Sequence, residues 1–375
     1  MKISASDFPS PHIPDKLPID TIIQKLTSEK DFLRTCLNAG QALSEFIGYL
    51  HNLPNPDILI TALTIQEAVE SSRIEGTMAT IEDVLHNEPT TEDIKNDIKE
   101  ISNYIAAIHY AFHEMRNKDI RISKYMICSL HQLLLSENVR GANKTPGAFK
   151  TEQNYIPNHK AGNFTPLPAY LTDEYIENLV NYINDADEVS DLIAIAIIHA
   201  QFEMIHPFKD GNGRIGRLII PLYLFIKGRI PYPVFYISRF FSENDDEYKE
   251  SLLGISKYHN TKLDIQGWKT WFLFFFKGII IESKRHIESA EKIIKLYKDM
   301  IEEVNKTDEI AIIDAIFNKL RVTPSQIIDE THLPKTSVYR ALSHLTKMGY
   351  LTRVGTPRKS QYIFTKLIIA LEPTV

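Results

Sequence analysis

Residues 206–217 read His-Pro-Phe-Lys-Asp-Gly-Asn-Gly-Arg-Ile-Gly-Arg, and this stretch determines how the rest of the chain is interpreted. The run 211–213 removes side-chain bulk, so backbone N–H groups can close around a phosphate. The apolar run 218–226 predicts a helix, which places those N–H groups at a helix N-terminus, where anions bind best. Arg214 and Arg217 are three residues apart, so they lie on one face of that helix and can reach the same ligand.

Two further residues of this stretch suit a nucleotide triphosphate. Asp210 supplies a hard oxygen ligand for Mg²⁺ held on phosphates. His206 can take a proton from an incoming hydroxyl group near neutral pH. The stretch therefore predicts a site that binds a magnesium triphosphate beside a general base.

Other phosphate-binding motifs explain the stretch less well. Residues 211–216 also satisfy the pattern G-x-G-x-x-G, but that dinucleotide fingerprint needs a strand before it and an acid about 20 residues after it. Here residues 192–205 have helical character, and no acid lies between Asp210 and Glu243. A Gly-Lys-Ser/Thr sequence at the end of a glycine-rich loop is also absent.

The stretch follows the pattern HPFx(D/E)GNGRxxR without a departure, and in this it resembles the Fic family. The resemblance implies a mostly helical core that transfers part of a nucleotide, usually AMP from ATP, to a protein hydroxyl. It implies that His206 is the general base and that Asp210 holds the Mg²⁺ that bridges the α- and β-phosphates. The backbone of residues 211–213 would form the anion hole, with Arg214 and Arg217 on the β- and γ-phosphates. The expected ATP-binding residues are Lys209, Asp210, Gly211, Asn212, Gly213, Arg214, Arg217 and Tyr248.

A second motif lies upstream, where residues 71–76 read Ser-Ser-Arg-Ile-Glu-Gly at the end of a stretch with helical spacing. This fits the pattern (S/T)xxxE(G/N) of the inhibitory helix in the Fic family, expected here at about residues 58–76. The resemblance implies that Ser71, Glu75 and Gly76 form the inhibitory element and that Glu75 pairs with Arg217, drawing it away from the γ-phosphate. Gly76 is well suited to end a helix. Two alternatives stay open: a solvent-exposed Glu before a turn, or, by resemblance to the family, a Glu that activates water to remove AMP.

The segment 146–157 is similar to the stretch that opens a β-hairpin flap in the family, where the target segment docks by strand addition. The expected docking residues are Gln153, Asn154, Tyr155 and Ile156. Short β-prone pieces broken by Pro157, Gly162 and Pro166 fit a hairpin or an irregular loop. Farther along, Tyr248 is a candidate for the nucleoside pocket, with simple core packing as the alternative.

Length and composition limit the classes of protein to which the chain can belong. A chain of 375 residues can form two or three domains, and its net charge of −6 argues against a protein that coats nucleic acid along its whole length. The two cysteines give no disulfide framework. Residues 1–20 lack the apolar core of a signal peptide, and the most apolar run, 268–281, is too short and too charged to span a membrane. We expect a cytoplasmic protein without a membrane partner.

Helical periodicity recurs along most of the chain, so the predicted fold is mainly α. We expect an N-terminal helical region (1–118), a Fic catalytic core with a short flap (119–282), a linker helix (283–305) and a small α+β winged helix-turn-helix domain (306–375). His199 and Glu203 lie one helical turn apart and could bind a metal together. No third ligand is evident, so a histidine packed in the core is the preferred interpretation.

The C-terminal domain is predicted from three helical segments followed by residues 351–364, which alternate about a turn at 355–357. Residues 306–375 hold ten Lys/Arg and six Asp/Glu, a local charge of +4. Candidate DNA contacts are Lys335, Thr336, Ser337 and Arg340 near the start of the third helix, and Arg358 on the wing. The alternative is a protein-docking or dimerisation module.

The function expected from these features is adenylyl transfer from ATP, with Mg²⁺, to a Ser, Thr or Tyr hydroxyl of a target protein or of the chain itself. Three alternatives stay open: the same site moves another group, the same site removes AMP, or the core senses ATP for a DNA-binding regulator. A homodimer would be unsurprising, although no sequence feature demands one.

Overall fold

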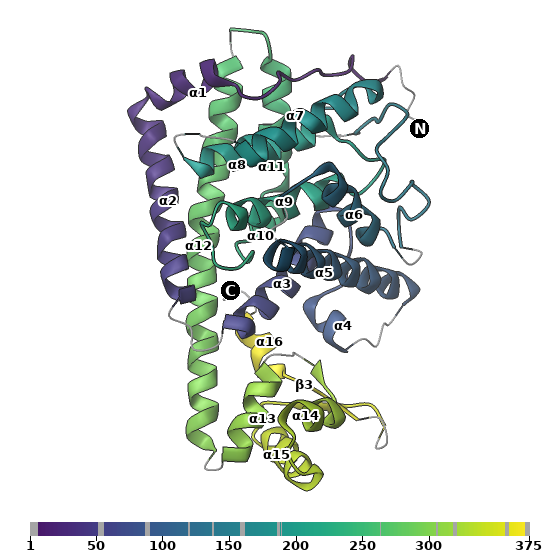
Figure 1. The fold of residues 1–375 in the computed structure, drawn as a ribbon, viewed down its shortest axis with the longest axis vertical. Coiled ribbons are helices and arrows are strands. Elements are labelled where there is room, and N and C mark those ends of the chain that lie inside the picture. The colour runs from purple at the N-terminus through teal and green to yellow at the C-terminus, as the bar shows by residue number, and fades with distance from the viewer. Residues whose placement is uncertain are drawn as a thin grey trace.

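The computed structural model of the protein describes residues 7–51, 56–86, 91–118, 121–136, 139–157, 162–185, 188, 190–262, 264–304, 307–317, 321–356 and 360–371. Figure 1 shows a stack of helices beside one long helix, with a small helix-and-strand domain at one end. Residues 206–217 are called the signature, and residues 206–211 the signature loop. The helices before the signature loop are α1 (Asp20–Thr27), α2 (Lys30–His51), α3 (Pro56–Ile74), α4 (Ile81–His86), α5 (Glu92–Lys118), α6 (Lys124–Leu134), the 3₁₀ turn η2 (Ala169–Leu171), α7 (Thr172–Asp185) and α8 (Asp191–Ile205). Those after it are α9 (Asn212–Ile226), α10 (Ser238–Glu243), α11 (Asp245–Tyr258), α12 (Asp264–Glu303), α13 (Thr307–Phe317), α14 (Pro324–Thr331), α15 (Lys335–Lys347) and α16 (Thr365–Leu371).

Helix α8 forms the centre of the core. Its residues from Leu192 to Phe202 are all buried, which is the pattern of a helix covered on every side. Helices α7, α9 and α12 pack against it. The signature loop leaves the end of this helix, so the site rests on an element that the core encloses.

The long helix α12 lies along α2, and the two run together down one side of the molecule in Figure 1. Phe272 and Phe276 of α12 pack on Phe32 of α2, with ring centroids 5.5 and 5.7 Å apart. The expected end of the catalytic core at residue 282 falls inside α12, which continues without a break to Glu303. One element therefore joins the core to the C-terminal domain.

The amphipathic stretch 20–50 is divided into two helices by a turn at Ser28. The hydroxyl of Thr27 donates to the carbonyl of Ile23, and that of Ser28 donates to the carbonyl of Lys25. Such side-chain bonds compete with the backbone ladder and end α1 there.

The C-terminal domain has the predicted winged helix-turn-helix form. Helices α13, α14 and α15 pack on one another, and strands β1 (Arg321–Val322), β3 (Gln361–Ile363) and β2 (Thr352–Val354) form an antiparallel sheet in that order. In its register Arg353 pairs with Tyr362. Helix α14 begins with a strong cap, since Thr323 and Gln326 form a reciprocal capping box and Pro324 opens the helix.

The predicted fold class is confirmed. Helices dominate the described chain, and the expected flap is present as a single antiparallel bridge between Ile156 and Phe164. In the part of the chain that the structure describes, no helix is both long and apolar enough to cross a membrane.

Candidate active site

The signature loop is bounded by two backbone turns in the left-handed region. His206 ends α8 with φ 49° and ψ 63°, and Gly211 precedes α9 with φ 75°. Glycine is suited to the second position because it has no Cβ to clash. Helix α9 begins at Asn212, so its first N–H groups, which lack partners within the helix, open toward the loop.

The side chain of Asn212 closes this loop. Its Oδ1 accepts from the backbone N–H of Phe208 at 2.8 Å, and its Nδ2 donates to the carbonyl of Phe208 at 2.8 Å. Both ends of the amide are therefore used in holding the loop. The side-chain amide is thus not available to a ligand, and only the backbone N–H of Asn212 is left for one.

A pocket of about 620 Å³ opens at the start of α9. From the signature it is lined by His206, Lys209, Asp210, Gly211, Asn212, Gly213 and Arg217. From elsewhere in the chain it is lined by Glu75, Ile156, Glu203 and Tyr248, among others. The fold thus gathers the end of α3, the flap, the signature loop and α11 around one cavity.

Gly213 is required where it stands because of the residues that face it. A Cβ on this glycine would collide with the carboxylate of Glu75 and the guanidinium of Arg217. The missing side chain therefore leaves room for both.

The imidazole of His206 lies on the pocket wall and is neutral at physiological pH. Burial and, to a lesser extent, the charge of Lys150 lower its pKa to about 4, while the charge of Glu75 acts in the opposite direction. Its Nδ1 is 3.8 Å from Oε2 of Glu203. Burial raises the pKa of that carboxyl group to about 8, so Glu203 is protonated and uncharged near neutral pH. A neutral imidazole is the form that can accept a proton.

Arg217 is held by Ser71 and Glu75, at the last turn of α3. Its Nη2 donates to Oε1 of Glu75 at 2.8 Å and to the carbonyl of Ser71 at 2.8 Å, and its Nε donates to the hydroxyl of Ser71 at 2.9 Å. Burial alone would raise the pKa of Glu75, but the charge and hydrogen bond of Arg217 outweigh burial and lower it. Gly76, with φ 99°, lets the chain turn away directly after this contact.

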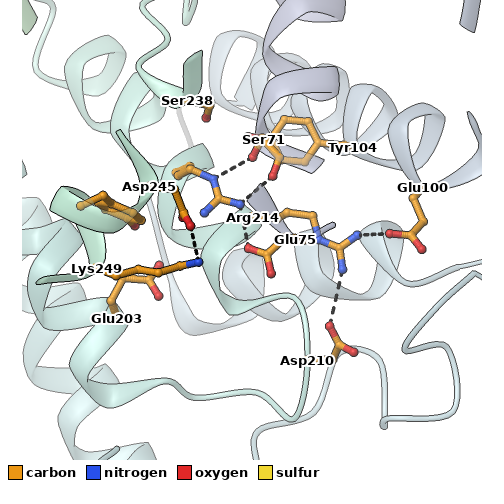
Figure 2. Close-up of polar contacts among 12 residues, drawn as sticks. Ser71, Glu75, Glu100, Tyr104, Glu203, Asp210, Arg214, Ser238, Asp245 and Lys249 are labelled. Atoms are coloured by element: carbon orange, nitrogen blue, oxygen red, sulfur yellow. Dashed lines mark hydrogen bonds and ion pairs between the residues drawn. The ribbon is translucent and has the colours of Figure 1, made fainter. Parts of the chain in front are cut away.

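Arg214 has a different environment from Arg217 (Figure 2). It is fully buried, its Nη1 donates to Oε2 of Glu100 at 3.0 Å, and its Nη2 is 3.6 Å from Oδ1 of Asp210. Glu100 also accepts from Arg140 at 3.3 Å. The side chain of Arg214 lies behind the pocket wall, where it supports Asp210.

Tyr248 both faces the pocket and packs in the core. It lines the pocket, yet it is only 4% exposed and stacks on Phe241 with ring centroids 4.3 Å apart. Its hydroxyl is 2.8 Å from Nε2 of His199, which is fully buried among aromatic rings. Tyr248 is thus a rigid ring at the edge of the cavity.

The four expected flap residues point in different directions. Gln153 donates to the carbonyls of Asn154 and Pro166, and Asn154 donates back to the signature loop. Tyr155 is 42% exposed and packs against Phe8, while Ile156 lines the pocket. The side chains of Gln153 and Asn154 are therefore held within the protein, whereas Tyr155 is partly exposed and Ile156 faces the pocket.

In the winged helix, Lys335, Thr336 and Arg340 are exposed on α15 and Ser337 is half-buried. The ammonium of Lys335 lies 5.7 Å from the ring centroid of Tyr339, which is 42% exposed. Arg358 lies outside the described residues.

Several residues that build the site carried no sequence motif. Besides Glu100 they include His131, whose Nε2 lies 3.0 Å from the carbonyl of Asp210 and whose ring stacks on Phe208 at 3.7 Å. Its Nδ1 accepts from the N–H of Gly147, so the proton is on Nε2 and is donated to the signature loop. Glu100 could have been recognised from its spacing, because it precedes Asn103, Tyr104 and Ala107 by three, four and seven residues on the buried face of α5.

The fold and the site together define a helical protein with a neutral, buried imidazole in a pocket at the N-terminus of a helix. A sequence model described as the Fic/DOC family N-terminal region matches residues 33–113, and that of the Fic/DOC family itself matches residues 121–224. The chain belongs to the Fic/DOC family. An IclR helix-turn-helix domain model also matches residues 310–355.

Similarity to individual proteins agrees with this assignment. The chain is 26% identical over 166 residues to a probable protein adenylyltransferase of Aquifex aeolicus, covering 44% of this chain and 49% of that protein. It is 32% identical over 87 residues to the protein adenylyltransferase fic-1 of Caenorhabditis elegans, covering 23% of this chain and 16% of the relative. The crystal structure of a Fic family protein from Desulfovibrio desulfuricans G20 matches with a TM-score of 0.56 and 17% identity, over 94% of this chain and 98% of that one. The chain thus spans about half the length of one curated relative and less than a fifth of the other, while the structural match supports the fold.

Proposed function

We propose that the protein is an ATP- and Mg²⁺-dependent protein adenylyltransferase that transfers AMP to a Ser, Thr or Tyr hydroxyl of a target protein or of its own chain. The observation that carries this proposal is the position of the neutral imidazole of His206 in the same pocket as the N-terminus of α9. The relatives named as protein adenylyltransferases support the same activity.

The chemistry follows from these groups. His206 takes the proton of the target hydroxyl while its oxygen attacks the α-phosphorus of ATP, and the bond from that phosphorus to the pyrophosphate oxygen breaks. The N–H groups of residues 211–213 stabilise the negative charge on the phosphate oxygens. The reaction needs little else from the protein than positioning and charge stabilisation.

Asp210 fits the role of magnesium ligand. Its carboxylate is 30% exposed and lines the pocket, and Mg²⁺ on a nucleotide is commonly held by one or two carboxylates together with phosphate oxygens and water. Within the described ranges, no three His, Cys, Asp or Glu side chains are grouped to hold a metal without a nucleotide. The ion would neutralise phosphate charge, and Arg214 and His131 keep Asp210 in place.

Restraint by Glu75 is part of the proposal. A guanidinium held by Glu75 and Ser71 is not free to bind the γ-phosphate, so ATP would lie in an unproductive position. Release of Arg217 would restore the phosphate contact. The same carboxylate, near the pocket, could instead activate water for removal of AMP, and a preloaded target incubated without ATP would reveal that reaction.

The test is label transfer from ATP tagged on the α-phosphate, run beside ATP tagged on the γ-phosphate. We expect α-label on protein, stronger in Glu75→Gly than in the wild type and absent in His206→Ala. Label from the γ-phosphate alone would identify a phosphate-transferring enzyme. ATP binding without label in any variant would favour a nucleotide sensor.

A second function is proposed for the C-terminal domain, namely DNA binding through α15. It is supported by the match to an IclR helix-turn-helix domain and by the exposed basic residues Lys335 and Arg340 on that helix. We expect retention on DNA at low salt, lost in the double variant Lys335→Ala/Arg340→Ala with label transfer intact. Absence of retention at low salt would leave a protein-docking role for the domain.

A further inference from the structure

Four successive carbonyl groups around His206 are held by two residues of the segment that precedes the flap. Lys150 donates from its Nζ to the carbonyl of Ile205 at 2.9 Å and from its backbone N–H to the carbonyl of Pro207 at 2.7 Å. Asn154 donates from its Nδ2 to the carbonyl of Phe208 at 2.7 Å and to that of His206 at 3.3 Å. The carbonyl groups on both sides of the base are thus fixed by one residue, Lys150.

These hydrogen bonds surround a backbone conformation that is unfavourable without them. His206 has a positive φ, which costs free energy for a residue with a Cβ and persists only when its surroundings hold it. The turn matters for function because it reverses the chain at the end of α8 and places the imidazole on the pocket wall.

The side chain of Lys150 is unusual for a lysine. The residue is only 3% exposed, burial lowers its pKa to about 7, and among the residues that the structure describes no carboxylate forms an ion pair with its Nζ. A buried ammonium without a carboxylate is costly. Its position at the C-terminal end of α8 offsets part of this cost, since the helix dipole and the last carbonyls favour a cation.

We propose that Lys150 is a positioning residue for the transfer reaction, whose ammonium group holds the left-handed turn that directs His206 into the pocket. This inference rests on the proposed adenylyl transfer and adds to it a residue that touches neither nucleotide nor target. Lys150 acts on the base through the carbonyl of Ile205, and Asn154 holds the next part of the same loop.

Substitutions at Lys150 can distinguish a positioning role from simple packing. Lys150→Met keeps the length of the side chain and the backbone bond to Pro207, and it removes only the ammonium. Lys150→Arg keeps a buried cation that can still donate to Ile205. Lys124→Met, which removes a partly exposed lysine paired with Asp173 and Glu177, is the matched control.

The variants should be compared in the Glu75→Gly background for kcat, for the KM of ATP and for ATP affinity. We expect Lys150→Met to lower kcat at least tenfold with the KM and affinity for ATP changed less than about twofold, because the turn rather than the phosphate site is disturbed. Lys150→Arg should recover most of kcat, and Lys124→Met should match the parent. A kcat within threefold of the parent in Lys150→Met, or a loss that appears equally in ATP affinity, would overturn the proposal.

Hydrogen–deuterium exchange of the peptide 203–214 provides a readout that does not depend on activity. Exchange should be faster in Lys150→Met and near that of the parent in Lys150→Arg. If the Glu75→Gly parent transfers no label, the proposed adenylyl transfer is contradicted. If hydrogen exchange is unchanged in Lys150→Met, the positioning of the turn by Lys150 is contradicted, whether or not label is transferred.

Discussion

The carboxylate of Glu75 accepts a hydrogen bond of 2.8 Å from Arg217, the last arginine of the signature, although 142 residues separate them in sequence. Helix α3 brings Glu75 close to Arg217, and α3 is itself held in place one helical turn before Ser71, at Glu67. There the buried carboxylate of Glu67 accepts from Ser238 at 2.5 Å and from Tyr104 at 2.9 Å. The contact between Glu75 and Arg217 therefore depends on how α3 is seated on α5 and α10.

Ser71 should share the restraint with Glu75. Its hydroxyl accepts from Nε of Arg217 at 2.9 Å, so Ser71→Ala removes one of the three bonds that hold the guanidinium. A hydrogen bond to a charged group contributes about 1.5 kcal/mol, so label transfer should rise roughly tenfold, less than in Glu75→Gly. Ser72→Ala is the matched control, because the hydroxyl of Ser72 is buried and has no hydrogen-bond partner among the described residues. Equal rates in both serine variants would show that Ser71 has no part in the restraint.

The pKa of His206 should be measurable directly. Burial and the charge of Lys150 lower it to about 4, so the base remains deprotonated as pH falls from 8 through about 6 and gains its proton only near pH 4. Carbon-13 labelling of the histidine ring, with the signal assigned by its loss in His206→Ala, would follow this titration. Glu75 raises the pKa, so Glu75→Gly should lower it further. A midpoint near the ordinary value of 6.5 would contradict the assignment of a buried, neutral base.

The sequence predicts those parts of the site whose residues lie close together along the chain. The signature loop and the residues 71–76 each lie within a few turns, so their patterns could be recognised and their side chains placed on helix ends. The partners of the supporting residues could not be predicted in the same way: spacing places Glu100 on the buried face of α5, but its contact with Arg214 spans 114 residues and belongs to no local motif. Lys150 was read only as part of the flap segment, since nothing in the sequence shows that a lysine is buried beneath a turn 55 residues later. The hydrogen bonds of Asn154 to the signature loop, across more than 50 residues, are likewise invisible in the sequence.

Glu67 should make the protein less stable as pH rises. Burial raises its pKa to about 7, against 4.5 in an unfolded chain, so between these values the folded protein binds a proton that the unfolded chain has lost. The stabilising contribution is complete below about pH 4.5 and is lost as pH rises through 7, a difference of about 3 kcal/mol. Glu203 and Glu282 act in the same direction.

Glu67→Gln tests this effect, because it keeps an oxygen that can accept from Ser238 and Tyr104 but cannot ionise. Urea unfolding at about pH 5 and pH 8 should show a smaller difference between the two pH values in Glu67→Gln than in the wild type. Glu250→Gln, on the exposed face of α11, should keep the wild-type difference. An undiminished difference in Glu67→Gln would mean that Glu67 is ionised at neutral pH in the folded protein.

Glu100 should be the most important single carboxylate for the stability of the site. Its side chain is 3% exposed and pairs with the fully buried Arg214, so Glu100→Gln leaves a buried cation whose only other described carboxylate is Asp210, at 3.6 Å. Breaking a buried ion pair from one side costs about 3–5 kcal/mol, which corresponds to a fall in Tm on the order of 10 °C. Glu92→Gln on the same helix is the control, because the pair of Glu92 with Lys95 is exposed and contributes below about 1 kcal/mol. Thermal melting of both variants decides the question: a fall in Glu100→Gln no larger than that in Glu92→Gln would show that Arg214 finds enough compensation in Asp210 alone.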